Sequence, residues 1–295
     1  MRKSYIIRNF KPKTLNFLLK VNEVLGEYRS QGYQLTIRQL YYQMVSRGFI
    51  ENSIRSYKNA VSIVGDGRLA GMVDWDMIID RNREVSYPPH WENPAEIVST
   101  AANQFRIDKW ENQEYYIEVM VEKDALSGVL EPVCEELDIR FTANKGYNSL
   151  SNMREVAQRF MQAIDDMKIP KLFYLGDHDP SGIDMTRDVE DRLSMFAGTH
   201  IDVERLALNM SQVEEMNPPP NPAKETDSRF ARYMEKFGET SWELDAIEPT
   251  VLVDIVKEAV YNFRDVDLWE EAELKEKGMK VELQEFVENY KAMHK

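Results

Sequence analysis

Two short, mostly apolar runs, each of which ends in an acidic residue, constrain the fold of this chain more than any other feature. The first spans residues 115–122 (YYIEVMVE), and the second spans 171–177 (KLFYLGD). Runs of this length and composition are typical of buried β-strands. Helical patterns over about 124–137 and 150–167 lie between them. A shorter strand-like run, IRFTA, separates these two helices, and another, IDVERLAL, follows a helix that begins after Gly182. This alternation predicts an α/β fold with a mostly parallel sheet.

The amino-terminal part has helical periodicity instead. We expect a helix over 12–30, a second after Thr36, and a third from Ser53 to about Val64. Thr36 and Gln39 have the spacing of a capping box, which marks a helix start. Three short helices with a tight turn before the third resemble a helix-turn-helix or winged-helix unit.

The formal charge of the chain is uneven. Its total is −14, but residues 1–62 hold eleven lysines and arginines against three acids, a balance of +8. The remaining residues therefore carry −22. Such asymmetry indicates a polyanion-binding segment on an acidic body, although a merely solvated basic face would give the same count. Arg55 and Lys58, on the expected third helix, are candidate contacts for DNA phosphates.

Composition and proline content suggest the domain organisation. We predict a winged-helix-like domain over 1–90, a linker over 91–112, a sheet domain over 113–265 and an acidic helix over 266–295. The linker prediction depends on the segment SYPPHWENP, whose three prolines disfavour regular structure.

Several classes of protein are disfavoured by composition. Cys134 is the single cysteine, which excludes an intrachain disulfide framework and a cysteine-rich zinc module. No phosphate-binding GxxxxGK[ST] loop occurs, and no apolar stretch is long enough for a signal peptide or a membrane span. With 43% apolar and 30% charged residues, we expect a globular protein of the cytoplasm.

Carboxylates at the expected strand ends predict a metal site. Glu122 ends one strand, and Asp177 and Asp179 follow another. Functional sites in parallel α/β sheets form at the carboxyl edge, where these side chains would meet. Carboxylate oxygens without histidine or cysteine suit Mg²⁺, with Mn²⁺ as a second choice. The alternative is a solvated loop, and His178 is expected to point away from the aspartates.

A second candidate site is the tyrosine pair of the second helix. The apolar stripe of that helix places Tyr41 on its buried side, whereas Tyr42 shares a face with Arg38 at spacing i, i+4. We therefore expect Tyr42 to be exposed beside an arginine, as a nucleophile for a phosphodiester would be. A phenol has a pKa of about 10 and needs nearby positive charge to ionise. A packing tyrosine is the alternative.

Four motifs together resemble one known family. The segments RQLYYQ, VEKDAL, NKGYNS and GDHDPSGIDM are similar to those of the topoisomerase VI A subunit and the meiotic double-strand-break transesterase. The chain looks like a short, stand-alone bacterial or phage member. The resemblance implies a winged-helix-like domain with a catalytic tyrosine and a Toprim domain, which is Rossmann-like and holds Mg²⁺.

The resemblance also implies roles for individual residues. Tyr42 would be the nucleophile and Arg38 its neighbouring arginine, and both Arg38 and Lys123 would contact DNA. Glu122 would act as a general acid/base or a metal ligand, with Asp177 and Asp179 as metal ligands. The flanking positions carried over with them are Lys145 and Gly146, with Lys145 as a further DNA contact.

A Mg-dependent cleavage of double-stranded DNA through a 5′-phosphotyrosyl link would follow from this family. The resemblance also implies a homodimer, in which each site combines the tyrosine of one subunit with the metal of the other. It further implies a nucleoid location and a separate ATPase subunit. This chain is shorter than the usual A subunit. Residues 217–246 have no role by resemblance, and we interpret Glu243 and Asp245 as packing residues rather than additions to the metal site.

Two other functions fit the same residues. A Toprim endonuclease would hydrolyse DNA with metal-bound water, and Tyr42 would then only pack or contact DNA. A non-catalytic DNA-binding module would need no converging carboxylates, which disfavours it.

Overall fold

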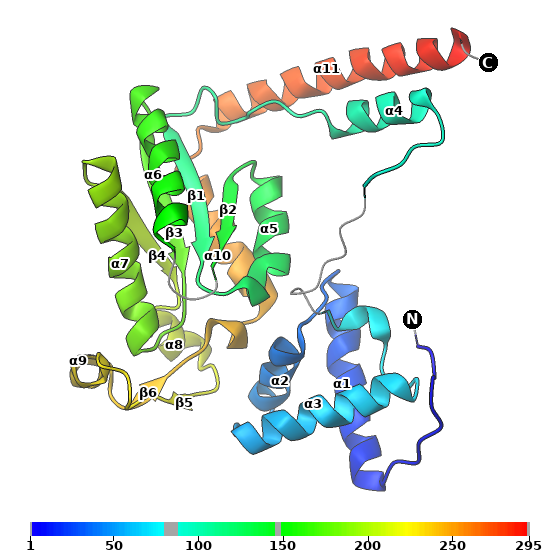
Figure 1. Ribbon diagram of the computed structural model, residues 1–295, viewed down its shortest axis with the longest axis vertical. Coiled ribbons are helices and arrows are strands. Elements are labelled where there is room, and N and C mark those ends of the chain that lie inside the picture. The colour runs from blue at the N-terminus through cyan, green and yellow to red at the C-terminus, as the bar shows by residue number, and fades with distance from the viewer. Residues whose placement is uncertain (1, 80–87, 145–148, 294–295) are drawn as a thin grey trace.

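The computed structural model describes residues 2–79, 88–144 and 149–293. Figure 1 shows a helical domain (residues 2–79), a sheet domain (residues 115–261) with helices on both faces, and two helices, α4 and α11, at the opposite end of the sheet domain from the helical domain. The sheet is four-stranded and parallel, which confirms the predicted α/β class.

The helical domain consists of α1 (Pro12–Ser30), α2 (Ile37–Ser46) and α3 (Ile54–Leu69). The predicted capping box is present: the Thr36 hydroxyl accepts a hydrogen bond from the Gln39 amide, and the Gln39 side chain accepts one from the Thr36 amide. The domain has its own core, in which Leu18, Val24 and Met44 are buried. Helix α3 extends past its predicted end near Val64 and stops at Leu69.

Strand pairing in the helical domain is minimal. Isolated bridges join Ser4 to Ala70 and Leu35 to Ile78, and a short 3-10 helix spans Trp75–Met77. Within residues 2–79 the structure describes no β-hairpin that could form a wing. The structure therefore shows the three predicted helices of this domain, whereas the wing is not among its described elements.

The sheet has the strand order β2-β1-β3-β4, with β1 (Tyr115–Val121) and β3 (Ile169–Leu175) at its centre. The outer strands are β2 (Arg140–Ala143) and β4 (Asp202–Ala207). Val121 pairs with both Leu175 and Ala143, so three strands end at the same level. The residues that follow β1 and β3 therefore emerge side by side at the carboxyl edge.

Each face of the sheet is covered by two helices. Alternate residues of a strand point to opposite faces, so Val119 packs with α5 (Ser127–Glu136) and α10 (Pro249–Tyr261). Met120 packs on the other face with α6 (Leu150–Asp165) and α7 (Pro180–Ala197). Cys134 is buried in α5, as predicted for a core cysteine. The result is a three-layer α/β/α domain with a core on each side.

The segment between β4 and α10 lies against the carboxyl edge of the sheet. It contains α8 (Met210–Met216), α9 (Phe230–Phe237) and a 3-10 helix (Leu244–Ala246). Strands β5 (Asn221–Pro222) and β6 (Thr240–Ser241) form a small antiparallel pair. In Figure 1 this pair lies between α9 and the helical domain.

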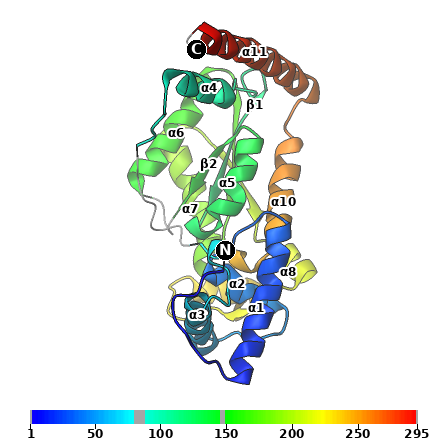
Figure 2. The same ribbon diagram turned by 90° about the vertical axis from the view of Figure 1, so that its right-hand side faces the viewer.

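The predicted linker is wrong for part of its length. Residues Pro94–Gln104 form helix α4, which packs along α11 (Val266–Met293) at the end of the molecule opposite the helical domain (Figure 2). Asn93 caps α4 by accepting a hydrogen bond from the Glu96 amide, and Pro94 occupies the first helical turn, where proline is tolerated. The acidic carboxyl-terminal helix is confirmed over its described residues.

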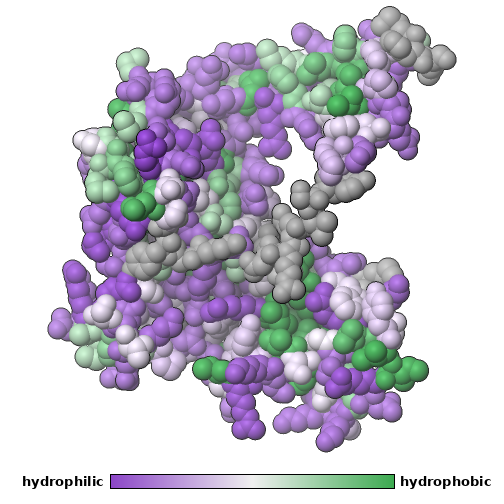
Figure 3. All heavy atoms as spheres, viewed as in Figure 1, coloured by the Kyte–Doolittle hydropathy of each residue, from purple (hydrophilic) through white to green (hydrophobic). Residues whose placement is uncertain are grey.

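The helical and sheet domains contact each other directly. The Tyr28 hydroxyl of α1 donates a hydrogen bond to the Glu248 carboxylate, which precedes α10, and Figure 2 shows α10 running down toward α1. Asn52 donates to Asn221 at 2.7 Å. The face in Figure 3 is mostly hydrophilic, with apolar side chains gathered mainly over the helical domain and near α4. Within the described ranges, no helix has both the length and the apolarity that a membrane span needs.

Candidate functional site

A cavity of about 630 Å³ lies between the helical domain and the carboxyl edge of the sheet. The helical domain contributes Arg38, Tyr41 and Tyr42, and the loop after β3 contributes Asp177 and Asp179. The segment around β5 and β6 closes it with the side chains Asn221, Lys224, Trp242 and Glu243. The structure therefore brings the predicted tyrosine and both predicted aspartates of one chain to a single cavity.

The two aspartates are fixed by different neighbours. Asp177 is buried, and its Oδ1 accepts a hydrogen bond from the Leu244 amide at 2.9 Å. Asp179 is the N-cap of α7, and its Oδ1 accepts one from the Gly182 amide at 2.6 Å. Burial and the nearby Glu243 raise the pKa of Asp177 well above its ordinary value, although Lys123 opposes this shift.

Glu122 is buried beside the aspartate loop and does not line the cavity. Its Oε2 accepts a hydrogen bond from the Asp177 amide at 2.9 Å, so it positions the loop. The carboxylate lies against Gly176 and Gly182, where a side-chain carbon would approach it within about 3 Å. Burial raises the pKa of Glu122, which suits a group that holds a proton.

Arg205, on β4, holds the same loop from the other side and was missed by sequence reasoning. Its guanidinium donates hydrogen bonds to the carbonyls of Gly176 and Asp177 at 2.8 and 2.6 Å, and to the Gly182 carbonyl at 3.1 Å. The sequence signal for this role is the position of Arg205 inside the strand-like run IDVERLAL. An arginine that is buried in a sheet needs several hydrogen-bond acceptors around it.

Lys123 lies where two carboxylates from distant segments converge. Its ammonium forms ion pairs with Asp177 and with Glu243, 120 residues further along the chain. Burial opposes the charge of Lys123, but Asp177, Asp245 and Glu243 raise its pKa well above the ordinary value. In this structure, the predicted DNA contact Lys123 is therefore a counter-ion within the site.

Asp245 is fully buried, and neither of its carboxylate oxygens has a hydrogen-bond partner. The Arg38 Nε lies 3.4 Å from Asp245 Oδ2, and Arg38 Nη2 lies 2.8 Å from Glu243 Oε2. The interpretation of Glu243 and Asp245 as packing residues is thus corrected: both balance the charges of Arg38 and Lys123. Sequence reasoning missed this because the partners are about 200 and 120 residues away.

The donor set fits a divalent cation. Asp177 and Glu243 already surround an ammonium, and the Asp245 oxygens lack hydrogen-bond donors. Oxygen-only ligands of this kind suit Mg²⁺ or Mn²⁺. As the side chains stand, the described residues include no group of three or more histidine, cysteine or acidic side chains arranged around one metal position. Lys123 would have to move for Asp177 and Glu243 to share a metal ion.

The two tyrosines of α2 have different surroundings. The Tyr41 hydroxyl accepts a hydrogen bond from the Ser53 amide at 2.9 Å and lies 3.1 Å from the Asn52 side-chain oxygen, so it holds the turn before α3. The Tyr42 hydroxyl instead lies 3.5 Å from Asn221 Nδ2 and also forms a side-chain hydrogen bond with Arg38. Tyr42 is therefore the tyrosine whose oxygen lies beside the arginine of the cavity.

The predicted exposure of Tyr42 is wrong. Its side chain lines the cavity, but the residue is only 5% exposed, because it packs with Tyr41, Ala60 and Ala246 and lies next to Asn221. Burial and the Glu243 charge raise its pKa, while Arg38 and Asn221 lower it. The Arg38 guanidinium lies 5.8 Å from the centre of the Tyr42 ring, which agrees with the shared face predicted for the two residues.

The other predicted DNA contacts have less defined surroundings. Arg55 and Lys58 are exposed on α3, the helix whose first turn borders the cavity at Ile54 and Tyr57. Their role stays a prediction. Lys145 and Gly146 lie outside the described residues.

His178 points away from the cavity, as predicted. Its Nδ1 lies 2.8 Å from the Tyr233 hydroxyl, and its backbone pairs with Trp242. Burial and the charge of Arg205 lower the pKa of His178 to about 4, so the ring is neutral at physiological pH. The histidine therefore joins the aspartate loop to α9 and β6.

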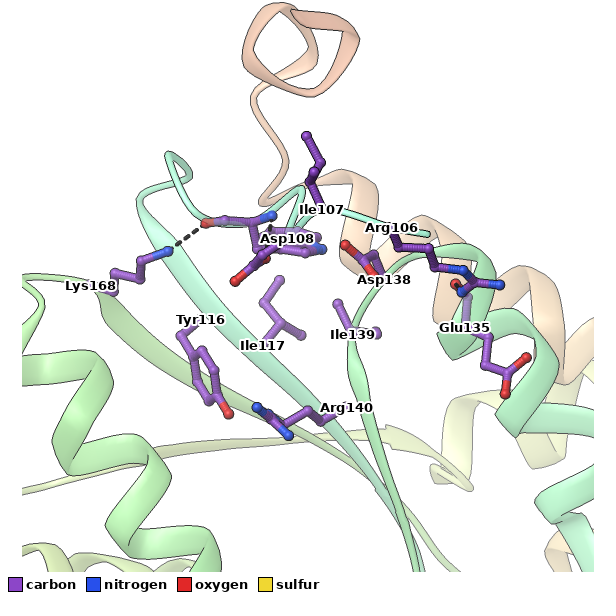
Figure 4. A pocket seen from close by; sticks show the side chains of 11 residues that line it. Arg106, Ile107, Asp108, Tyr116, Ile117, Glu135, Asp138, Ile139, Arg140 and Lys168 are labelled. Atoms are coloured by element: carbon purple, nitrogen blue, oxygen red, sulfur yellow. Dashed lines mark hydrogen bonds between the residues drawn. The ribbon is translucent and has the colours of Figure 1, made fainter. Parts of the chain in front are cut away.

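A second cavity, of about 440 Å³, lies at the amino ends of β1 and β2 (Figure 4). It is lined by two arginines, Arg106 and Arg140, and by three acidic residues, Asp108, Glu135 and Asp138. The Lys168 ammonium, which also lines this cavity, donates a hydrogen bond to the Trp110 carbonyl at 2.5 Å. This cavity lies at the opposite end of the strands from the aspartates.

No known protein-family model matches the chain, and no curated protein matches it at the level of sequence. The family resemblance therefore remains a prediction from the motifs.

Proposed function

We propose that this protein is a Mg-dependent DNA-cleaving transesterase of the topoisomerase VI A type. The observation that carries the proposal is the shared cavity, where Tyr42 and Arg38 of the helical domain face Asp177, Asp179 and Glu243. A nucleophilic hydroxyl, a guanidinium and several carboxylates are the groups that metal-assisted phosphoryl transfer requires.

The proposed reaction exchanges one phosphoester for another. The Tyr42 oxygen attacks a backbone phosphorus and gives up its proton, and the bond from phosphorus to the 3′ oxygen breaks. The 3′ oxygen leaves as a hydroxyl after it takes a proton, and the 5′ end stays joined to Tyr42. Arg38 would stabilise the charge on the phosphate in the transition state.

The carboxylates have separate tasks in this proposal. Asp177, Asp179 and Glu243 would hold the metal ion, which would neutralise phosphate charge and stabilise the leaving oxygen. Glu122, which the resemblance assigns as a general acid/base, would hold the aspartate loop in place through its hydrogen bond from the Asp177 amide. Because the Glu243 charge raises the pKa of Tyr42, neutralising Glu243 favours ionisation of the phenol.

The resemblance extends the proposal to partners. Double-stranded DNA would be the substrate, a second copy of the chain would form a homodimer, and a separate ATPase subunit would drive strand passage. A nucleoid location would follow from DNA binding.

One observation favours a second candidate, a Toprim endonuclease without a covalent intermediate. Tyr42 is buried and its pKa is raised, so its phenol is not activated in this structure. A hydrolase would need the carboxylates and a metal-bound water but no activated tyrosine.

Supercoiled plasmid distinguishes the two candidates. Protein and Mg²⁺ or Mn²⁺ are incubated with plasmid, the reaction is stopped with detergent, and products are compared with and without protease. Wild type is compared with Tyr42→Phe, Tyr41→Phe and Asp177→Asn. Tyr41→Phe is the matched control, because it removes a neighbouring hydroxyl from the same cavity.

For a transesterase, we expect protein-linked ends from wild type and Tyr41→Phe, and no cleavage by Tyr42→Phe or Asp177→Asn. Free ends from wild type, with cleavage retained in Tyr42→Phe and lost in Asp177→Asn, would identify the nuclease instead.

A further inference from the structure

Helix α9 forms one wall of a small cationic cavity next to the candidate site. The cavity has a volume of about 220 Å³, and its charged side chains are Arg187, Arg229, Arg232, Lys236 and the single acid Asp184. Two aromatic residues, Tyr233 and Phe237, also line it. A net positive cavity is unexpected here, because the chain after residue 62 carries −22 overall.

Two of these cations differ from the other two in their ion pairing. Arg229 is bound by Asp227 at 2.7 Å, and Arg187 is bound by Asp184 at 2.8 Å. Arg232 and Lys236 are exposed and form no ion pair within the described ranges. They are four residues apart on α9, so they share one face of the helix.

Helix α9 is fixed to the aspartate loop. The Tyr233 hydroxyl contacts His178 Nδ1 at 2.8 Å and donates a hydrogen bond to the His178 carbonyl at 3.0 Å. Pro180 lines the cationic cavity, while its neighbour Asp179 lines the candidate site. The two cavities are therefore adjacent, and α9 cannot shift without moving the residues between the aspartates.

The cations of the helical domain lie on the other side of the site. In Figure 1, α9 and α3 lie on opposite sides of the β5–β6 pair. Arg55 and Lys58 on α3 are exposed, as are Arg232 and Lys236 on α9. Positive charge thus flanks the acidic site on two sides.

We propose that α9 is a phosphate-binding element, in which Arg232 and Lys236 bind the backbone of double-stranded DNA that extends past the aspartates. The inference rests on the proposed function, because it takes DNA as the substrate. It gives residues 217–246 two roles: β5, β6 and Glu243 close the site, and α9 holds the duplex beside it. Arginine and lysine are the residues that contact phosphates without reading sequence.

The test is a binding measurement that needs no cleavage. Fluorescence anisotropy of a labelled duplex is followed over a range of KCl concentrations, in EDTA and again in Ca²⁺. Wild type is compared with the double variant Arg232→Glu, Lys236→Glu. The matched control is Lys275→Glu, Lys277→Glu on α11, which makes the same change in net charge at exposed positions far from the site.

We expect the α9 variant to bind about 10-fold more weakly near 0.1 M salt, and its salt slope to fall by about 2, since each lost phosphate contact removes about 0.9. The α11 control should stay within about 3-fold of wild type, because screening weakens distant charges. The neutral variant Arg232→Gln, Lys236→Gln should show a smaller loss in the same direction.

Two results would overturn different claims. If wild type binds the duplex and the α9 variant behaves as the α11 control does, the role of α9 is wrong while the proposed function stands. If wild type binds no duplex in either buffer, the proposed function itself fails. Circular dichroism of both variants confirms that they are folded.

Discussion

Lys123 is the residue on which the charge balance of the site depends. Its ammonium pairs with Asp177 and Glu243, and it also lowers the pKa of buried Asp245. Removing one partner of a buried ion pair leaves the other charges uncompensated, which costs about 3–5 kcal/mol. A tethered ammonium and a divalent cation would therefore compete for the same carboxylates.

We predict that Lys123→Met is destabilised by about 3 kcal/mol without divalent metal, because its carboxylates repel one another. Added Mg²⁺ should then raise the melting temperature of the variant more than that of wild type. Thermal unfolding in EDTA and in Mg²⁺ measures both effects.

Lys257→Met is the control for Lys123→Met, since Lys257 pairs with Glu136 at the surface. Such exposed pairs contribute about 0–1 kcal/mol. Equal Mg²⁺ shifts in wild type and both variants would contradict the competition between Lys123 and a metal ion.

His178 gives the fold a defined pH dependence. Its pKa is about 4 in the folded protein against an ordinary value of 6.5, so folding favours the neutral ring. The stabilisation is complete above pH 6.5 and is lost as pH falls toward 4. The shift corresponds to about 3 kcal/mol at most.

We predict that His178→Asn is less stable than wild type at pH 7 and that the difference shrinks as the pH falls to 4. Asparagine keeps an oxygen near the position of Nδ1, where the Tyr233 hydroxyl lies. Urea unfolding in EDTA at several pH values measures the difference. A gap that is constant from pH 7 to 4 would show that His178 does not titrate in this way.

At the scale of elements, the turn from β3 into α7 leaves no room for added atoms. A side-chain carbon on Gly182 would lie 2.2 Å from the Asp177 carbonyl oxygen, which is backbone and cannot rotate away. The same carbon would lie 3.0 Å from Glu122 Oε2. Glycine at this position lets Asp179 cap the helix while Glu122 reaches the Asp177 amide.

We predict that Gly182→Ala destabilises the fold by about 2 kcal/mol or more, because overpacking forces the backbone to shift. Gly278→Ala is the opposite case, since nothing lies within 4 Å of the added carbon in exposed α11. That change should stabilise the protein by about 0.5–1 kcal/mol through helix propensity. Chemical unfolding of the two variants compares them, and the same sign for both would contradict the packing described.

At the scale of the whole molecule, the two domains of one chain enclose the site. Tyr42 and the two aspartates line one cavity, and ion pairs from Arg38 to Glu243 and Asp245 join the domains. The family resemblance instead implies a site shared between two subunits. The structure of the single chain therefore favours a site that is complete within one chain.

We predict that mixing Tyr42→Phe with Asp177→Asn restores no cleavage, because no chain then has both groups. The variants are purified separately, unfolded and refolded together so that subunits can exchange, and assayed on supercoiled plasmid. Wild type treated in the same way is the control. Single-strand nicking by the mixture would show that one subunit supplies the tyrosine and the other the aspartates.

Local sequence patterns predict most of the helices and strands and the positions of the candidate site residues along them. Apolar runs predicted β1 and β3, the Thr36 capping box predicted the start of α2, and the strand ends predicted Glu122 and the aspartates. These signals are local, because propensity, capping and strand length act within a few residues. The prolines near the start of α4 predict a linker, but the structure has a helix there because proline is tolerated in a first turn.

The assembly of the site depends on contacts between segments that are far apart in the sequence. Lys123 meets Glu243, Arg38 meets Asp245, and Asn221 meets Tyr42 across about 120 to 210 residues of chain. No local pattern records such pairs, because each charge could equally face water when the sequence is considered alone. The burial of Tyr42 has the same origin: helical periodicity places it on the Arg38 face of α2, but the covering segment comes from the sheet domain.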